Sequence, residues 1–326
     1  MAVVSGTFET FTAKGIREQL SSVITRITPE DTPYISNIGT GEKLTNTYFE
    51  WQTDELAAAA NNRIAEGDEA SFSAITPTVR MGSYTQISRK TLIISGTHES
   101  TNRAGRKSEM AYQLAKAGAE IKRDMEKMLL ENQKTDAGSS GTARETGGLA
   151  AWLKTNTSIG TGAAADPAWT GSSPTAGRTD GTTRALTEAL LKDVIKQCFD
   201  EGAKPSMVLL GSAQKQVASA NLAGIAEQRY NAEGAKATTI IGAADIYVSD
   251  FGNLSIVPDR FIRSSGRDAF VIDPDYASVC YLRPFKTEDL AKTGDAEKKM
   301  LITEYGHKVH TEKAHGIIAD LSTAAS

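Results

Sequence analysis

The chain has 326 residues, with 36 Lys and Arg against 40 Asp and Glu, so its formal net charge is −4, and 40% of its residues are hydrophobic. This composition excludes collagen-like, coiled-coil and wholly disordered proteins. The mildly acidic balance lacks the basic surface on which nucleic-acid binding depends. The length corresponds to roughly two domains and allows a sizeable buried core.

The sequence lacks the features of secreted and membrane proteins. Cys198 and Cys280 are too few for a disulfide framework and match no metal-binding spacing, so we expect two buried thiols in a reducing cytoplasm. The N-terminal residues MAVVSGTFETFTAKG contain no basic head followed by an apolar run, and no stretch approaches 18 consecutive apolar residues. We therefore expect neither a signal peptide nor a membrane span.

The N-terminal third of the chain predicts an arm and a hairpin that have no hydrophobic core of their own. Residues 1–45 mix hydroxyl residues with short apolar patches and include one short helical pattern, Ile16–Ile27, so they predict an extended arm. Side chains alternate as in a strand from Asn46 to Leu56, and a second β-prone run extends from Thr78 to Ile94. A polar stretch separates the two runs. Residues 46–95 therefore predict a long hairpin that projects from the body.

The clearest helix is predicted from Arg103 to Lys134. Its apolar residues recur at spacings of three and four and form one stripe: Met110, Leu114, Ala117, Ile121, Met125 and Met128. Lys–Glu pairs at i,i+4 lie on the opposite side and each add a few tenths of a kcal/mol. At 1.5 Å per residue the helix is on the order of 45 Å long. That length suits a spine on which other elements pack.

The rest of the chain predicts an insertion, a compact domain and a terminal hairpin. Residues 136–182 are dominated by Gly, Ser, Thr and Ala, and they predict a long surface excursion, partly ordered and tolerant of substitution. From Arg184, short helical and strand patterns alternate, which predicts a compact α/β domain of roughly 95 residues. Residues 276–326 contain two strand runs joined by the polar segment LAKTGDAEKK. They predict a hairpin that returns the chain to the first domain.

No arrangement of residues in the sequence supports catalysis. His307, His310 and His315 lie close together in YGHKVHTEKAHG, but the first two point to opposite faces if this segment is a strand. We therefore expect polar histidines on strand faces and no metal. No serine lies in a G-x-S-x-G motif, and Asp273 and Asp275 lie in turn-forming sequence. The sequence predicts no catalytic residues and no cofactor.

This order of parts, together with the segments TPYISNIGTG, NTYFEWQTDELA and YLRPFKTEDLAKTGDAEKKMLITEYGHKVHTEKAHGII, resembles the major capsid proteins of tailed bacteriophages with the Hong Kong 97-type fold. The resemblance covers most of the chain and is weakest in the insertion. It implies an α+β fold with an N-terminal arm, an extended loop, a peripheral domain with a spine helix, and an axial domain. The implied boundaries are 1–45 for the arm, 46–95 for the extended loop, 96–135 for the spine part of the peripheral domain, 136–182 for the insertion, 183–275 for the axial domain and 276–326 for the C-terminal hairpin.

The resemblance also implies a function. It implies a structural subunit that assembles into hexamers and pentamers of an icosahedral shell around double-stranded DNA, in a virion that is built in the bacterial cytoplasm. Separate scaffold, portal and cement proteins are the expected partners, and DNA is expected to be enclosed without sequence-specific binding. Some relatives crosslink a loop Lys to a neighbour's Asn. Between Trp51 and Arg89 this chain has arginines but no Lys, so we expect a non-covalent shell.

Three groups of residues are the candidate assembly contacts, because arm and loop residues without a partner in their own subunit must be buried against a neighbouring subunit. We expect inter-subunit packing by Phe49, Trp51 and Leu56. We expect polar contacts at the loop tip by Arg63, Glu66, Asp68 and Glu69, and contacts at the spine start by Arg103, Arg106 and Lys107. On this hypothesis, Trp51→Ala impairs assembly more than it impairs folding of the monomer.

Two alternative functions stay open at the level of sequence. A bacterial nanocompartment shell of the encapsulin type shares the fold and holds cargo enzymes, and the neighbouring genes distinguish it from a phage shell. A metal hydrolase built on the C-terminal histidines is the other alternative, and metal analysis of the purified protein tests it.

Overall fold

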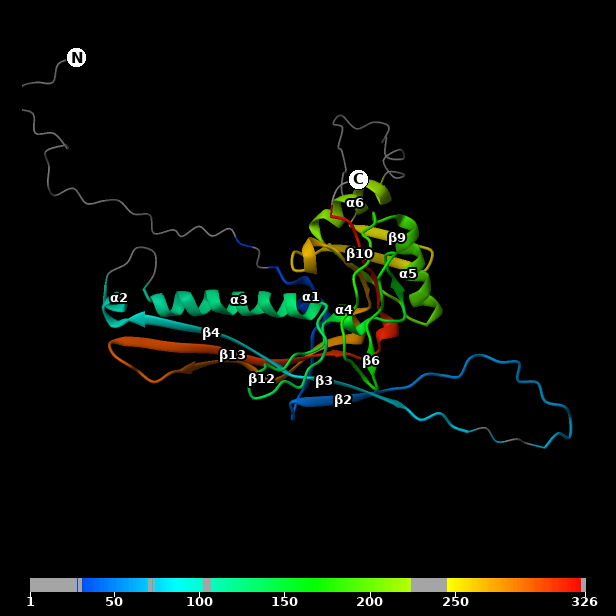
Figure 1. The fold of residues 1–326 in the computed structure, drawn as a ribbon, viewed down its shortest axis with the longest axis horizontal. Helices are drawn as coiled ribbons and strands as arrows, with labels where there is room; N and C mark the ends of the chain where they lie inside the picture. The colour runs from blue at the N-terminus through cyan, green and yellow to red at the C-terminus, as the bar shows by residue number, and fades with distance from the viewer. Residues whose placement is uncertain are drawn as a thin grey trace, which may run out of the picture.

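The computed structural model describes residues 31–69, 74–101, 107–223 and 245–323 together with Thr28 and Phe72. The expected helix at Ile16–Ile27 lies outside this part of the chain. Figure 1 shows two lobes and one projecting loop. We call the four-stranded sheet with helix α3 (Glu109–Leu130) the spine lobe, and the six-stranded sheet with helices α5 (Glu188–Asp200) and α6 (Ser212–Ala223) the second lobe.

The spine lobe is a sheet with one long helix laid along it. Its strands, in spatial order, are β1 (Thr40–Lys43), β12 (Ala277–Asp289), β13 (Ala296–Val309) and β4 (Gln86–Ser95). The predicted terminal hairpin is confirmed, because β12 and β13 pair antiparallel from Ala277↔Val309 to Asp289↔Lys299. Strand β4 pairs antiparallel with the other edge of β13 and lies under α3.

Helix α3 confirms the predicted spine but is shorter than Arg103–Lys134. It begins after Ser108, whose hydroxyl oxygen accepts a hydrogen bond from the Ala111 N–H at 3.2 Å and so caps the helix. Its 22 residues correspond to about 33 Å. Most of the predicted stripe is buried, namely Met110, Ala117, Ile121 and Met125, whereas Leu114 and Met128 are half-buried.

The second lobe confirms the predicted alternation of short helices and strands. Its strands, in spatial order, are β5 (Thr157–Ser158), β14 (Gly316–Ile318), β11 (Ala269–Ile272), β8 (Met207–Leu210), β10 (Gly252–Pro258) and β9 (Ile246–Ser249). All four residues of β8 are buried, because alternate side chains pack under α5 on one face and into the core of the spine lobe on the other. The two lobes therefore share a core.

The C-terminal residues differ from the expectation that they all return to the first domain. After the β12–β13 hairpin, β14 crosses into the second lobe and pairs antiparallel with β11 and parallel with β5. Gly316 permits this placement, because a side chain there would collide with Val194 of α5. The chain end thus fastens the two lobes together.

The expectation that residues 136–182 form a surface excursion is wrong for the stretch around residues 146–153, which is buried, whereas most of the remaining segment is exposed or half-buried. Helix α4 (Leu149–Trp152) lies in this segment, and Trp152 and Leu153 are fully buried. The polar residues around them are held by main-chain pairs, such as the reciprocal hydrogen bonds of Ala165 and Thr179 at 3.1 and 2.9 Å. A Gly-, Ser- and Thr-rich composition is compatible with a packed segment when its backbone groups find such partners.

The predicted hairpin of residues 46–95 is divided in the structure. Strands β2 (Tyr48–Thr53) and β3 (Val79–Tyr84) pair antiparallel, but the chain then leaves the hairpin at Thr85 and enters the spine lobe as β4. Thr85 fixes this change of direction, since its N–H donates to the Thr47 carbonyl at 2.8 Å and its hydroxyl donates to the buried Glu304 at 2.9 Å. Only the loop between β2 and β3 projects.

The described part of the arm also departs from the expectation that it packs elsewhere. Helix α1 (Pro33–Ile38) places Tyr34 fully inside the subunit's own core, and Ile38 and Leu44 are buried there too. The remaining short elements are α2 (Gly96–Ser100), β6 (Trp169–Thr170), β7 (Ser173–Pro174) and the 3-10 turns η1 (Arg263–Ser265), η2 (Pro274–Tyr276) and η3 (Glu312–Ala314).

Candidate assembly surfaces

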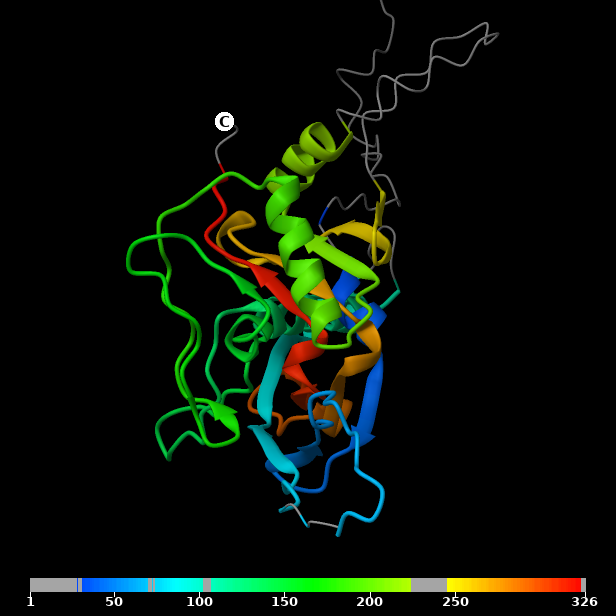
Figure 2. The ribbon, with the colours of Figure 1, turned by 90° about the vertical axis from the view of Figure 1, so that its right-hand side faces the viewer.

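The loop between β2 and β3 leaves the body of the subunit and exposes apolar side chains. Residues 54–78 carry no helix or strand in their described positions, and Figures 1 and 2 show them extending well beyond both lobes. The apolar residues exposed along this loop are Leu56, Ile64, Phe72 and Ile75, and Val79 at the start of β3 is exposed too. Leu56, Phe72 and Ile75 are each more than nine-tenths exposed. This many large apolar groups exposed on one segment indicates a surface that another molecule covers.

The structure overturns the expectation that Phe49 and Trp51 lack a partner in their own subunit. Both are 8% exposed, their rings stack at 5.7 Å, and Trp51 also lies 5.5 Å from the ring of Trp152. The indole N–H of Trp51 donates to the His310 carbonyl at 3.1 Å. Gly306 of β13 lies directly against the Phe49 ring, where a side chain would collide. These aromatics anchor the hairpin to its own body and leave Leu56 alone in the predicted packing group.

The polar residues predicted for the loop tip are exposed and available. The tip turns at Gly67, whose φ is +86°, and the Asp68 N–H donates to the Ala65 carbonyl at 3.2 Å. The predicted tip residues are Arg63, Glu66, Asp68 and Glu69, and all four are exposed. No side-chain hydrogen bond or ion pair connects them to another residue in the part of the chain that the structure describes.

A cleft lies where the loop leaves the body. It has a volume of about 790 Å³ and is bordered by the loop root, the end of α5 and the segment after β13. The Lys313 ammonium bridges Glu55 of the loop root and Glu201 at the end of α5, at 2.9 Å from each carboxylate. The hydrogen bonds that the Lys313 ammonium donates to these two carboxylates raise the pKa of Lys313. This bridge connects the loop root to the end of α5.

The predicted contacts at the spine start are only partly described. Lys107 lies just ahead of α3 and is exposed. Arg103 and Arg106 lie outside the described residues. The structure therefore brings Lys107 to the surface and leaves its contact with a neighbour a prediction.

Sequence patterns did not single out the open face of strand β4. Alternate residues of this strand face α3, as the ion pair between Lys90 and Asp124 at 2.9 Å shows, and the others face away from it. The residues that face away include Ile87, Arg89 and Ile93, and all three are exposed. The strand alternates between half-buried and exposed residues along its whole length. The sequence contains no matching signal, because apolar residues lie on both faces of the strand, with Leu92 and Ile94 towards α3 and Ile87 and Ile93 away from it.

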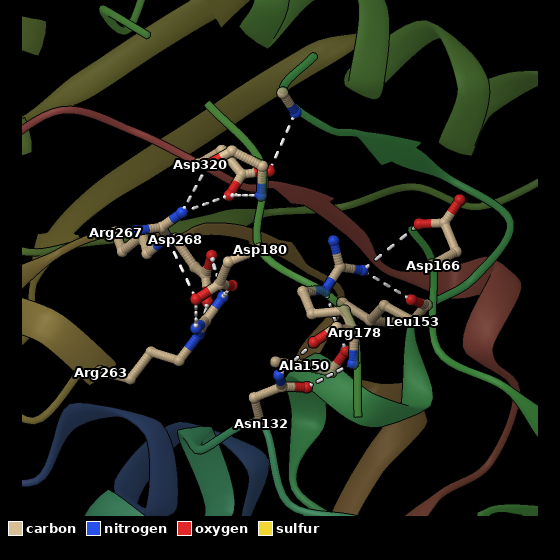
Figure 3. Close-up of polar contacts among 12 residues, drawn as sticks. Asn132, Ala150, Leu153, Asp166, Arg178, Asp180, Arg263, Arg267, Asp268 and Asp320 are labelled. Carbon is tan, nitrogen blue, oxygen red and sulfur yellow. Dashed lines mark hydrogen bonds and ion pairs between the residues drawn. The ribbon is translucent and has the colours of Figure 1, made fainter. Parts of the chain in front are cut away.

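A polar network fastens residues 136–182 to the second lobe (Figure 3). The Arg263 guanidinium binds Asp180 through two hydrogen bonds at 3.0 and 2.7 Å and also binds the fully buried Asp268. Arg267 donates to Asp320 at 2.8 Å, and Asp320 also accepts backbone N–H groups from the inserted segment. Burial alone raises the pKa of Asp320, but these hydrogen bonds hold it below its ordinary value.

Arg178 is the centre of a second polar cluster in the same segment (Figure 3). Its side chain is almost completely buried and donates to the carbonyls of Ala150 and Leu153, at 3.3 and 2.9 Å. Its backbone exchanges hydrogen bonds with the Asn132 amide, and Asp166 lies 3.6 Å from its guanidinium. Burial lowers the pKa of Arg178. These contacts join α4 to the end of α3, and the composition of the segment gave no sign of them.

Two of the three C-terminal histidines, His307 and His315, are buried instead of lying on a polar strand face, whereas His310 is half-buried. His307 of β13 is fully buried; its Nδ1–H donates to the Gly147 carbonyl at 3.0 Å and its Nε2 accepts from the Tyr34 hydroxyl at 2.7 Å. Burial lowers the pKa of His307 and of His315 to about 4 each. Within the described ranges, no three His, Cys, Asp or Glu side chains lie where they could hold a metal ion.

Among the described residues, no helix has both the length and the apolar character needed to cross a membrane.

Comparison with known proteins places the chain among phage capsid proteins. A family model described as SU10 major capsid protein matches residues 3–322. The major capsid protein of Escherichia phage Phieco32 is 29% identical to this chain over an alignment 359 residues long, gaps included. The alignment covers 95% of this chain and 96% of that protein.

Solved structures show the same fold at low sequence identity. The capsid of cyanophage A-1(L) matches with a TM-score of 0.70 at 13% identity, covering 96% of this chain and 98% of that one. The SrpI encapsulin of Synechococcus elongatus PCC 7942 matches with a TM-score of 0.58 at 8% identity, covering 95% and 94%. The predicted Hong Kong 97-type α+β fold is thus confirmed, and the fold alone does not separate phage shells from encapsulins. The family model does separate them, and with 320 of 326 residues matched, the chain belongs to the SU10 family of major capsid proteins.

Proposed function

We propose that the subunits of this phage shell interlock through the loop at residues 54–78, and that they form the hexamers and pentamers of an icosahedral head around double-stranded DNA. The carrying observation is the nearly complete exposure of Leu56, Phe72 and Ile75 on a segment that extends beyond its own subunit. Burial of one such side chain on a neighbour contributes about 1.5–3 kcal/mol. A closed ring repeats this contact at every subunit.

The open face of the spine lobe is the proposed counterpart of the loop. On the face away from α3, cross-strand register places the buried Glu304 between Arg283 and Ile87, the buried Ile302 between Lys286 and Arg89, and Lys298 directly beside Ile93. Arg283 is paired with Glu304 at 2.8 Å and Lys286 with Glu288 at 3.2 Å, so Arg89 and Lys298 provide the excess positive charge on this face.

The charge of the loop is opposite to that of this face. Residues 54–69 contain five acids and one Arg, a net charge of −4. Ile87 and Ile93 offer exposed apolar groups between the basic side chains. Apolar groups ringed by complementary charge are the expected composition of a specific protein interface.

The implied division of the chain fits this arrangement. We assign residues 1–45 to the arm, 46–95 to the extended loop, 96–135 with the C-terminal hairpin to the peripheral domain, and 183–275 to the axial domain. Two observations modify these boundaries, since β4 lies in the spine lobe and β14 in the second lobe. Residues 136–182 connect the lobes.

The partners follow from the same proposal. Scaffold, portal and cement proteins are separate chains, the shell is non-covalent because the loop has no Lys between Trp51 and Arg89, and assembly takes place in the host cytoplasm. The net charge of −4 suits a wall that confines DNA without sequence-specific binding. The role is structural and not catalytic, and the buried histidines serve the core.

Charge reversal with rescue tests the proposed contact. Glu66→Lys combined with Glu69→Lys is expected to raise the protein concentration needed for assembly, because it brings like charges together. Adding Arg89→Glu and Lys298→Glu to that variant is expected to restore assembly. Lys122→Glu, on an exposed position of α3, is the matched control and should leave the concentration unchanged. Failure of the second pair to rescue the first contradicts the assignment of this face.

A further inference from the structure

Two buried carboxyl groups meet where the spine helix contacts the second lobe. Glu126 lies on α3 and is fully buried, and Asp259 directly follows β10 and is 1% exposed. The two carboxyl groups are neighbours, and each affects the pKa of the other. Neither residue belongs to the loop contact described above. An acidic pair in the core between two lobes needs a physical explanation.

The pair also connects the arm to this junction. The two Glu126 carboxyl oxygens accept the N–H groups of Tyr34 and Ile35, at 2.6 and 2.9 Å, at the beginning of α1. Asp259 accepts the Phe261 N–H at 2.7 Å through Oδ1, while its buried Oδ2 has no conventional hydrogen-bond partner. Arm, spine and second lobe therefore converge on two carboxyl groups.

The charged and titratable groups around the pair do not neutralise it. Arg123, one turn earlier on α3, lies over the Phe261 ring at 5.9 Å. The Tyr34 hydroxyl is bonded to His307, and the Arg263 guanidinium is bonded to Asp180 and Asp268. Among the described residues, no ion pair reaches either carboxyl group. Two neighbouring carboxylates that are buried without a cation cannot both be ionised at low cost.

We propose that Glu126 and Asp259 hold one proton between them, and that this proton keeps the spine helix, the arm and the second lobe locked together until alkaline pH removes it. The pair is then a pH-sensitive latch within the subunit. The expected loosening of particles at alkaline pH rests on the proposed shell function, whereas the expected effect on the stability of the single subunit does not.

The direction of the titration supports the latch. Burial, and then the neighbouring Asp259 charge, raise the pKa of Glu126 to about 8, and burial raises the pKa of Asp259. A carboxyl group whose pKa is raised in the folded state stabilises the fold fully below its unfolded pKa, near 4.5. Between about pH 4.5 and about pH 8, loss of this one proton on unfolding lowers the ratio of folded to unfolded protein about tenfold per pH unit. Above about pH 8 the proton no longer stabilises the fold.

Infrared difference spectroscopy of the full chain tests the proton directly. At pH 7, wild type minus Glu126→Gln is expected to show the carbonyl stretch of one protonated carboxyl group, and in wild type this band should disappear with a midpoint near pH 8. Asp259→Asn should move the midpoint downward, because Glu126 then keeps two N–H donors and loses its acidic neighbour. Glu120→Gln, a half-buried position on the same helix, is the control and should leave the band unchanged.

Several outcomes decide the proposal. Absence of the band in wild type at pH 7, or an equal band in Glu126→Gln, overturns it. If both variants fail to fold, the presence and midpoint of the wild-type band still decide whether the proton is there. Imaging of particles at pH 7 and pH 9 tests the latch in the shell: loosened particles at pH 9 in wild type but not in Glu126→Gln support it, and equal behaviour overturns the latch. Absence of particles at both pH values would count against the shell function alone.

Discussion

Exposed apolar residues on the loop make it possible to separate assembly from folding. In the double variant Leu56→Ser and Ile75→Ser, two side chains that are more than nine-tenths exposed become polar, so the isolated subunit loses almost no packing. If a neighbour buries both, each contributes about 1.5–3 kcal/mol. The loss of about 3–6 kcal/mol for each loop contact lowers its association constant by about 10²- to 10⁴-fold.

Light scattering against protein concentration measures this effect, and denaturant unfolding of the dissociated subunit provides the second readout. The double variant should need a much higher concentration to assemble, while its free energy of unfolding stays within about 0.5 kcal/mol of wild type. Trp51→Ala, on the same hairpin, is the matched contrast: its ring is buried in its own subunit, so it should cost about 3–5 kcal/mol of subunit stability. Assembly of the double variant at the wild-type concentration would refute the reasoning.

Three further predictions concern the core and the shell. Arg178→Met should destabilise the subunit by about 2–5 kcal/mol in denaturant unfolding, because it leaves two buried carbonyls unpaired. Arg80→Gln breaks an exposed ion pair with Glu50 and should cost under about 1 kcal/mol. Equal costs for the two variants would contradict this prediction. His307 and His315 are neutral in the folded subunit, and the stability linked to this is complete above their unfolded pKa near 6.5. It is lost as pH falls to about 4, by about 3 kcal/mol for each histidine. The free energy of unfolding should therefore differ less between pH 7 and pH 4.5 in His307→Gln than in wild type. Denaturing electrophoresis of mature particles should show a single monomer band, and a ladder of covalent oligomers would show that the shell is crosslinked after all.

Local sequence patterns were sufficient to predict the spine helix and the projecting hairpin of this subunit. The stripe from Met110 to Met128 predicted the spine helix, and the alternation after Asn46 predicted a projecting hairpin, because both periods are set by backbone geometry and appear within a few turns or residues. Boundaries were less accurate. The Ser108 cap depends on one hydrogen bond, and the change of direction at Thr85 depends on two, one of them to Glu304 far along the chain.

Contacts between residues that are far apart in the sequence could not be predicted in the same way. The alternation of β2 shows that Phe49 and Trp51 share a face, but it does not show whether that face packs on Trp152 of the same chain or on another subunit. Arg178 lies in a segment whose composition indicated solvent, and its role depends on carbonyls of α4 that only the fold brings near. The same applies to His307, whose partner Tyr34 comes from the arm.

Electron cryo-microscopy of the purified wild-type chain over a range of concentrations tests the central claim most directly. We predict closed particles or capsomer rings in which residues 54–78 of each subunit lie over the open face of β4 in a sister subunit. A subunit that stays single at high concentration, with this loop folded back and its apolar residues covered by its own lobes, would contradict the account.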